Sequence, residues 1–364
     1  MRILIANFIT NGNRYLIDLK KGLENYANVV WDYEEFWKCE NDYDIVHIHW
    51  PEFLSYEVQN YVWTTDPFPK QLFNQIETCL KYWKQHATII YTRHNKHPHL
   101  RHDKDFLNLY RIVTTYCHTV VHFSHYSVEQ FNYLYPEHHG INHVVIPHHN
   151  YAAMKNLSSQ HEARQHLNIE DEATVMLVFG TVYDREKAFI KKALSYIPSK
   201  KKVLLAPSWR VNRRKIGYIR LREWVWEFEK WLAKQNKSFH IDKGFVIEKD
   251  AHWYINAADF MLIPRQKELN SGNISLGFTF AKVVLGRQGG DIGELLNKHS
   301  NPTFKEGDDE SLQKAIESAI QLSKTNKGQI NQELAMSQWD VATISGQYIT
   351  AMLKAMERKN QKLS

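Results

Sequence analysis

Residues 258–286 read ADFMLIPRQKELNSGNISLGFTFAKVVLG, and this stretch carries the clearest signal of the fold. An apolar run at 260–263 ends in a polar loop that contains Asn270, Ser271 and Gly272, and a second apolar run follows. Packing alone does not call for a small Ser-Gly pair there, because neither residue fills a core. We therefore expect a ligand to come close to this backbone, beyond the end of a strand, as in open α/β sheets.

The same alternation continues along the whole chain. Short β-branched runs are separated by helix-compatible segments, which predicts a parallel sheet covered by helices on both faces. The runs that we interpret as strands or strand-containing segments are 1–6, 29–33, 44–50, 87–94, 118–124, 143–147, 174–180, 201–208, 245–249, 254–264 and 280–286.

The length indicates more than one domain. A chain of 364 residues exceeds what one hydrophobic core normally holds. A polar stretch at 148–173 interrupts the alternation, which then restarts. We predict two Rossmann-like domains at 1–165 and 166–335, with a cleft between them, and a closing helical segment at 336–364.

Bulk properties narrow the class of protein. The net charge of +6 suits a phosphorylated ligand, an anionic membrane surface or nucleic acid, without selecting among them. Three separated cysteines without CxxC spacing are typical of reduced thiols in a cytoplasmic protein. The N-terminal apolar run is too short for a signal sequence, and no run reaches ~18 apolar residues, so we expect no integral membrane protein.

Polar residues, many of them histidines, follow the predicted strands of the N-terminal half. Any single histidine is ordinarily a hydrogen-bonded or surface ring, but the group indicates a binding site. His47 and His49 have a spacing conceivable for zinc, and Asp42-Tyr43-Asp44 is a DxD, yet we expect no metal, since the DxD precedes its strand. The candidates on this rim are Asn11, His47, His49, Trp50, Glu52, His94, Asn95, His122, His148 and Tyr151.

Cations follow the predicted strands of the C-terminal half. A helix that starts near Ser271 would offer free N–H groups and a positive dipole end to an anion. The alternative is that Asn-Ser-Gly is only an N-cap. Because cations converge from other loops, we predict a phosphate site there, with Arg185 and Lys187 among its cations. The wider set of candidate ligand-binding residues in this half is Gly180, Arg210, Arg265, Glu268, Asn270, Ser271, Gly272 and Asn273.

The positions of these cations argue against a nucleic-acid partner. They cluster in loops after strands and do not form a stripe interleaved with exposed aromatics. The partial exception is WRVNRRKIGYIRLR at 209–222, which could touch an anionic lipid surface or a lipid-linked phosphate as easily as RNA.

Together, the motifs resemble a known family. The order of HIHWPE, YTRHNKHPH, PHHNY, FGTVYDREK and ADFMLIPRQKELNSGN is similar to that of glycosyltransferases of the GT-B fold, especially the family 4 type that builds bacterial surface polysaccharides. The resemblance implies that a C-terminal helix crosses back to the first domain. It also implies that His94 and Asn95 lie near the donor sugar, that Arg185 and Lys187 contact the diphosphate, that Ser271, Gly272 and Asn273 cradle it, and that His148 and Tyr151 border the cleft.

The chain departs from the family pattern in two places. Gly277 stands where many relatives carry a second glutamate that binds the ribose, and Glu268 only roughly occupies the place of the first. Tyr183 stands where an arginine is common. These departures leave the nucleotide contacts open.

The resemblance implies transfer of a sugar from a UDP- or GDP-linked donor to a hydroxyl of a saccharide acceptor. We expect the N-terminal rim to hold this acceptor, through Asn11, His47, His49, Trp50, Glu52, His122, His148 and Tyr151. We expect a lipid-linked acceptor, peripheral contact with the inner membrane, retention of anomeric configuration and no metal or other cofactor. An inverting transferase would need a base such as His49, Glu52 or His122. The residues also leave open a nucleotide-sugar epimerase and a non-catalytic saccharide or nucleic-acid binder of the same architecture.

Overall fold

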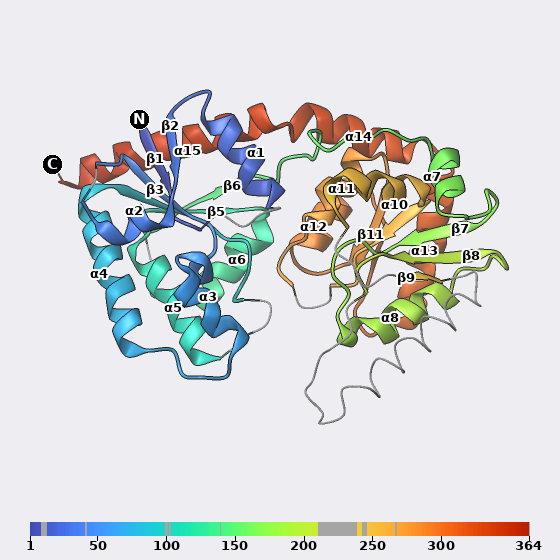
Figure 1. Ribbon diagram of the computed structural model, residues 1–364, viewed down its shortest axis with the longest axis horizontal. Helices are drawn as coiled ribbons and strands as arrows, with labels where there is room; N and C mark the ends of the chain where they lie inside the picture. The colour runs from blue at the N-terminus through green and yellow to red at the C-terminus, as the bar shows by residue number, and fades with distance from the viewer. Residues whose placement is uncertain are drawn as a thin grey trace. The chain divides into compact units, whose positions relative to one another are not determined.

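The computed structural model describes residues 1–8, 13–40, 42–98, 101, 103–138, 140–209, 239–241, 246–265 and 268–363. The chain forms two compact units (Figure 1). The N-terminal unit comprises Met1–His149, Glu268–Asn270 and Gln338–Ser364, and the C-terminal unit comprises Asn150–Lys267 and Ser271–Ser337.

The chain thus passes from one unit to the other at His149–Asn150, whereas the predicted domain bounds were 1–165, 166–335 and 336–364. The reason is α7 (Gln160–His166), which packs on α10 (Ala251–Ala257) of the C-terminal unit. A capping box formed by Ser159 and Glu162 starts α7. Arg164 then anchors the helix through an ion pair with Asp259 at 3.0 Å.

A parallel sheet forms the centre of the N-terminal unit. Its described strands follow the order β2-β1-β3-β4-β5-β6. Most strand residues are buried, as expected for a parallel sheet covered on both faces. The strands are β1 (Arg2–Ile5), β2 (Asn28–Trp31), β3 (Ile45–Ile48), β4 (Thr88–Thr92), β5 (Thr119–His122) and β6 (Asn142–Val145).

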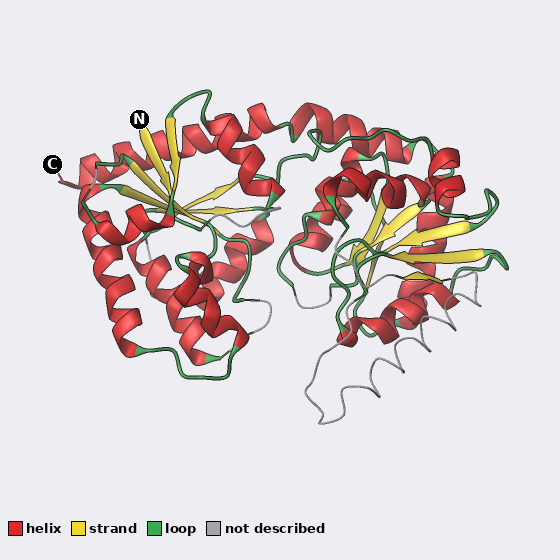
Figure 2. Ribbon diagram, in the orientation of Figure 1, coloured by secondary structure: helices red, strands yellow, loops and turns green. Residues whose placement is uncertain are grey.

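Helices cover both faces of this sheet (Figure 2). On one face, strand residues such as Val46 and Ile89 pack against a buried stripe of α4 that includes Ile76, Leu80 and Trp83. This spacing of three to four residues is the amphipathic pattern that makes α4 a core helix. The helices between the strands are α1 (Arg14–Leu23), α2 (Tyr33–Lys38), α3 (Tyr56–Asn60), α4 (Lys70–His86), α5 (Lys104–Tyr116) and α6 (His125–Leu134), with 3₁₀ turns η1 (Pro51–Phe53) and η2 (Tyr61–Trp63).

The other face is covered by α1 together with the last helix of the chain, α15 (Val341–Leu363). Tyr348 and Met352 of α15 are fully buried in the same cluster as Ile3 and Ile45. A Cβ at Gly22 of α1 would lie 1.9 Å from Ser345 Oγ, so the two helices approach closely (Figure 1). The prediction that the C-terminal helix returns to the N-terminal domain is confirmed.

The C-terminal unit repeats the plan, with described strands in the order β12-β11-β10-β7-β8-β9. The strands are β7 (Thr174–Leu177), β8 (Lys202–Ala206), β9 (Phe239–Ile241), β10 (Phe260–Leu262), β11 (Val283–Arg287) and β12 (Thr303–Phe304). Its further helices are α8 (Asp184–Ser195), α11 (Asn273–Thr279), α12 (Gly290–Lys298), α13 (Asp309–Ser323) and α14 (Lys327–Gln338), with the 3₁₀ turn η3 (Glu248–Asp250).

The C-terminal unit also contains the differences from the predicted elements. The prediction of a strand at 245–249 is wrong, because residues 248–250 form η3. The strand that pairs with β8 is β9. The basic segment singled out at 209–222 lies, apart from Trp209, outside the described residues. Cys39, Cys79 and Cys117 are free thiols. Among the described helices, none is both long and apolar enough to cross a bilayer.

Candidate functional site

The strand order of the C-terminal sheet reverses at β7. The strand that follows in the chain, β8, lies on one side of β7, and β10 lies on the other. In open α/β sheets, ligands bind beyond the carboxyl ends of the strands at such a reversal. The loops after β7 and β10 are the ones that lead into α8 and α11, and they contain most of the predicted phosphate-binding residues.

The loop after β7 contains a glycine whose backbone conformation other residues rarely adopt. Gly180 has a φ of 87°, which side-chain-bearing residues rarely adopt, and no atom lies within 4 Å of the position of an added Cβ. Asn273 at the start of α11 donates a hydrogen bond from Nδ2 to the carbonyl oxygen of Phe179 at 2.8 Å. This bond ties the two loops of the reversal together.

Arg265 fixes the first turn of α8 to the loop after β10. Its Nη1 forms an ion pair with Glu186 Oε1, and its Nη2 donates to the carbonyl oxygen of Thr181. The other carboxylate oxygen of Glu186 accepts from the backbone N–H of Tyr183 at 2.9 Å. Glu186 is only 5% exposed, so this carboxylate acts as an internal brace between the loops.

Two further cations stand at the same end of α8. The guanidinium of Arg185 lies 5.2 Å from the centroid of the Tyr183 ring, and that of Arg265 lies 5.3 Å from it. Lys187 Nζ is 2.7 Å from Asp184 Oδ1 and 5.3 Å from the centroid of the Trp209 ring. Among the described residues named here, three cations and the two carboxylates of Asp184 and Glu186 leave one net positive charge, at the helix end where the dipole is also positive.

The predicted helix start near Ser271 is confirmed, since α11 begins at Asn273 with Gly272 as its N-cap. Gly272 has a φ of −60°, so its backbone angle does not require glycine. Ser271 Oγ accepts from the N–H of Asn273 at 3.3 Å, which is a capping bond made one residue before the N-cap itself. Contact of Ser271 or Gly272 with phosphate stays a prediction.

The N-terminal sheet brings three of the predicted histidines together. His49 Nδ1 and His94 Nε2 are 3.0 Å apart and share a hydrogen bond. The ring centroids of His47 and His49 are 4.0 Å apart, and the indole of Trp50 stacks on His94 at 4.0 Å. His47 and His49 are fully buried, whereas His94 is 6% exposed. We call His47, His49 and His94 the histidine cluster.

The histidine cluster is electrically neutral at neutral pH. Burial lowers the pKa of His47 to about 3. Burial, followed by the neighbouring imidazoles, lowers the pKa of His49 and of His94 well below the usual value. The cluster therefore carries no positive charge at neutral pH, and His94 is its only ring with any exposed surface.

A chain of hydroxyl groups supports the cluster from α1 and α15. His47 Nε2 shares a hydrogen bond with Thr92 Oγ1 at 2.8 Å, and the Tyr348 hydroxyl lies 3.3 Å from the same Thr92 oxygen. The hydroxyls of Tyr15 and Tyr348 are 2.8 Å apart. The orientation of His47 is thus set in part by a helix at the far end of the chain.

Two predicted rim residues lie in other surroundings. Glu52 is 4% exposed, and its Oε2 accepts a hydrogen bond from the hydroxyl of Tyr110 at 2.8 Å. His122 is fully buried and shares hydrogen bonds with Ser127 Oγ at 2.8 Å and His143 Nδ1 at 3.0 Å. The structure does not bring these two side chains into the histidine cluster.

The remaining predicted residues are divided between the units. His148 Nδ1 shares a hydrogen bond with the carbonyl oxygen of His149, and burial lowers its pKa to about 3. Tyr151 belongs to the C-terminal unit, where its N–H donates to Thr279 Oγ1 at 3.0 Å. Glu268 and Asn270 belong to the N-terminal unit, and Asn270 Nδ2 donates to the carbonyl oxygen of His94 at 2.6 Å. Asn95, which follows His94 in the chain, is buried.

Asn11 and Arg210 lie outside the described residues. Within the described ranges, no group of three or more His, Cys, Asp or Glu side chains is arranged to hold a metal ion. In the DxD, Asp44 Oδ2 accepts from the N–H of Arg2 at 2.7 Å, so this carboxylate holds the start of β1 in place. A metal-free reaction stays a prediction.

Comparison with known proteins gives similarity in structure only. The sequence matches no family model and no curated protein. HepE from Anabaena, in complex with UDP and glucose, is 13% identical, with 97% of this chain and 100% of that chain covered at a TM-score of 0.65. The E. coli trehalose-6-phosphate structure bound with UDP-2-fluoro glucose is 9% identical, with 96% and 98% covered at 0.66.

A third similar structure is the sucrose-phosphate synthase of Thermosynechococcus elongatus, 14% identical, with 98% of this chain and 81% of that chain covered at a TM-score of 0.60. The chain has the GT-B fold. The predicted fold class is thereby confirmed, while the identities are too low to establish an activity.

Gly277, which stands where the resemblance would place a glutamate, has a packing role in this GT-B fold. A Cβ at Gly277 would lie 2.5 Å from Val284 Cγ2, and Gly277 is buried between α11 and β11. A glutamate could not enter that position unless Val284 moved. The glycine therefore follows from close approach of the helix to the strand.

Several contacts of the candidate site were not predicted from the sequence. Glu186, Thr181 and Asn273 bond across loops that are distant in the chain. Glu186 lies three residues after Tyr183, the spacing of a capping box, but a tyrosine at the N-cap is not part of that sequence signature. Tyr15 and Tyr348, which support the histidine cluster, are too far apart in sequence for any local signal.

Proposed function

We propose that the chain is a glycosyltransferase that moves a sugar from a nucleotide-sugar donor, linked to UDP or GDP, to a hydroxyl of a saccharide acceptor. One observation carries the proposal. At the strand reversal of the C-terminal sheet, Gly180 opens the backbone while Arg185, Lys187 and Arg265 gather at the start of α8. An excess of positive charge beside exposed backbone suits a diphosphate.

The chemistry requires stabilisation of the leaving group. The bond between the anomeric carbon and the diphosphate oxygen breaks, and negative charge grows on that oxygen. Arg185 and Lys187 then act as fixed charges that stabilise the nucleoside diphosphate without a metal ion. Lys187 forms an ion pair with Asp184, but its ammonium group has three N–H donors and can also donate to a phosphate oxygen.

The histidine cluster is proposed to serve the sugar side of the reaction. Neutral imidazoles hydrogen-bond to hydroxyl groups without attracting the diphosphate. His94 is the least buried ring of the cluster and stacks on Trp50, so it is the member that we assign to the transferred sugar. Asn95, Ser271 and Gly272 are assigned to the donor on the resemblance to the family, and His148 and Tyr151 to the acceptor.

We further propose that anomeric configuration is retained, that the acceptor is lipid-linked, and that the protein acts in surface polysaccharide synthesis in the cytoplasm, in peripheral contact with the inner membrane. These assignments rest on the sequence resemblance. Similar structures in complex with UDP-glucose or UDP-2-fluoro glucose support the choice of a nucleotide sugar as donor.

The test is release of UDP or GDP from a panel of nucleotide sugars, measured with and without extracts of lipid-linked saccharides as acceptor. The proposal predicts release that depends on the acceptor and label transfer into the saccharide. Donor turnover without any acceptor would instead identify an epimerase or hydrolase. Absence of turnover with every donor, despite tight saccharide binding, would identify a non-catalytic binder.

A further inference from the structure

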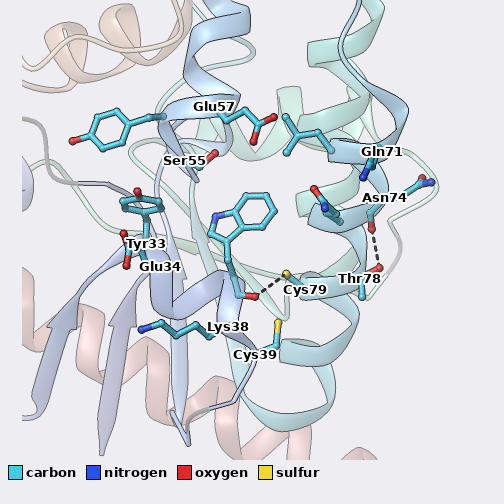
Figure 3. A pocket seen from close by; sticks show the side chains of 14 residues that line it. Tyr33, Glu34, Lys38, Cys39, Ser55, Glu57, Gln71, Asn74, Thr78 and Cys79 are labelled. Carbon is cyan, nitrogen blue, oxygen red and sulfur yellow. Dashed lines mark hydrogen bonds between the residues drawn. The ribbon is translucent and has the colours of Figure 1, made fainter.

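A large hollow in the N-terminal unit remains outside the site described above. It has a volume of about 1110 Å³ and is lined by α2, α4 and the start of α3 with its N-cap Ser55 (Figure 3). We call it the α2–α4 hollow. Tyr33 begins α2 after β2, and Ser55 follows β3, so the hollow opens near the carboxyl ends of these strands.

One wall of the hollow is aromatic. Tyr33 and Tyr56 meet edge to face at 5.7 Å between ring centroids, and the indole of Trp37 lines the hollow with its Nε1 bonded to the carbonyl oxygen of Leu54. Tyr56 is 53% exposed. Because the Tyr56 ring stacks on Phe8 at 4.4 Å, it is held in place and has one face left for a ligand.

The opposite wall carries amides. Gln71, Asn74, Gln75 and Thr78 follow the helical spacing that places them on one face of α4, and all four line the hollow. Figure 3 shows Gln71, Asn74 and Thr78 on this wall. The side-chain amides of Gln71, Asn74 and Gln75 are exposed and have no hydrogen-bond partner among the described residues. Amides that face aromatic rings across a hollow provide the hydroxyl-binding and stacking groups that a sugar chain needs.

The charges at the hollow favour a ligand without negative charge. Glu34 and Glu57 are exposed carboxylates in its lining, and the one lining cation among the described residues, Lys38, is paired with Glu35 at 2.8 Å. A phosphate or uronate entering the hollow would meet these carboxylates with no unpaired cation of the described lining to offset them. The charge pattern therefore selects a neutral saccharide over an acidic one.

A row of aromatic rings connects the hollow to the histidine cluster. From His94 the contacts run through Trp50 at 4.0 Å and on to Phe53 at 5.8 Å. Phe53 meets Phe8 at 5.2 Å, and Phe8 stacks on Tyr56 at the mouth of the hollow. Phe53 and Trp50 are partly exposed.

We propose that the α2–α4 hollow binds the distal units of a neutral oligosaccharide acceptor whose growing end lies at His94. This assignment rests on the proposed function and adds the substrate class, namely an extended, uncharged saccharide. Tyr56 and Tyr33 stack on sugar faces, and the amides of α4 bind hydroxyl groups.

The test is binding of the full chain, without nucleotide, to a printed array of neutral hexasaccharides built from glucose, galactose and mannose, together with hexagalacturonate and palmitate. We expect saturable binding of at least one neutral hexasaccharide. Tyr56→Ala and Gln75→Ala should each weaken it by about tenfold, the range of one aromatic or hydrogen-bond contact. Tyr26→Ala removes a tyrosine that is equally exposed, at 52%, outside the hollow, and should leave binding unchanged.

Three results would overturn the proposal. The protein could bind none of the neutral hexasaccharides, wild type and Tyr56→Ala could bind equally well, or the protein could prefer hexagalacturonate or palmitate. Gln75 is exposed and unbonded within the described chain, so its variant reports on binding without a folding defect. UDP and GDP binding, measured in parallel, separates the two claims, because the proposed function fails if nucleotide binding is absent even where the hollow binds sugar.

Discussion

Acidification should destabilise the N-terminal unit through the histidine cluster. His47 is fully buried with a pKa of about 3, so it stays neutral in the folded chain while the unfolded chain takes up a proton below about 6.5. A lowered pKa in a histidine means stability that is lost as pH falls from 6.5 towards 3. Between pH 7 and pH 5, His47 alone should cost about 2 kcal/mol of unfolding free energy.

The rest of the cluster acts in the same direction, because the pKa values of His49 and His94 are also lowered by burial. A loss of this size is a large share of the roughly 5–15 kcal/mol that stabilises a typical domain. We therefore expect the urea midpoint of the N-terminal unit, followed by peptide-resolved hydrogen exchange, to fall steeply from pH 7 to pH 5.

The perturbation is His47→Gln, which removes one titrating ring. Near pH 5 it should reduce the slope of unfolding free energy against pH by about 1.4 kcal/mol per pH unit. Thr92→Val is the matched control, since it removes the hydrogen bond to His47 but keeps the ring, and it should lower stability with little change in slope. Identical slopes for wild type and His47→Gln would refute the reasoning.

Three further substitutions test the C-terminal unit. Lys187→Ala should lower turnover by at least ~10²-fold if Lys187 stabilises the leaving group, while Lys191→Ala, an exposed lysine one turn further along α8, should not; equal rates in an acceptor-dependent assay would remove Lys187 from the mechanism. Gly180→Ala should cost about 1–2 kcal/mol in urea unfolding through its positive φ, and an unchanged midpoint would show that the turn adapts. Gly277→Glu should destabilise by about 1–3 kcal/mol through the clash with Val284 and bring no gain in donor affinity, so tighter nucleotide binding would contradict the packing role.

The sequence predicted those parts of the fold that local pattern encodes. Buried parallel strands appear as continuous apolar runs, which is why β1, β3, β4 and β7 were found close to their observed bounds. The strand at 239–241 was missed because its three residues, Phe239, His240 and Ile241, carry too little pattern, and 245–249 was misread as a strand since an apolar run alone does not specify strand pairing.

The candidate site could be predicted only as far as strand ends indicate it. The loops after β7 and β10 were identified because ligands bind at the carboxyl ends of strands. The sequence could not reveal which polar side chains bond to other residues of the protein and are therefore less available to a ligand. Glu186 bonds to Arg265, and Glu52 bonds to Tyr110, through contacts between residues far apart in the chain.

The hollow and the support of the histidine cluster were missed for the same reason. The hollow depends on two helices, α2 and α4, that are separated in sequence, and no local motif marks it. The hydroxyl chain depends on Tyr348, which reaches Thr92 only because α15 returns to the N-terminal unit.

Hydrogen exchange with and without UDP or GDP tests the central claim most directly, because it maps the bound nucleotide onto the backbone. The account predicts slower exchange of the amides in peptides that cover residues 179–187 and 271–279 when nucleotide is added. Unchanged exchange in both peptides, with protection appearing around residues 33–39 and 71–79 or nowhere, would contradict it.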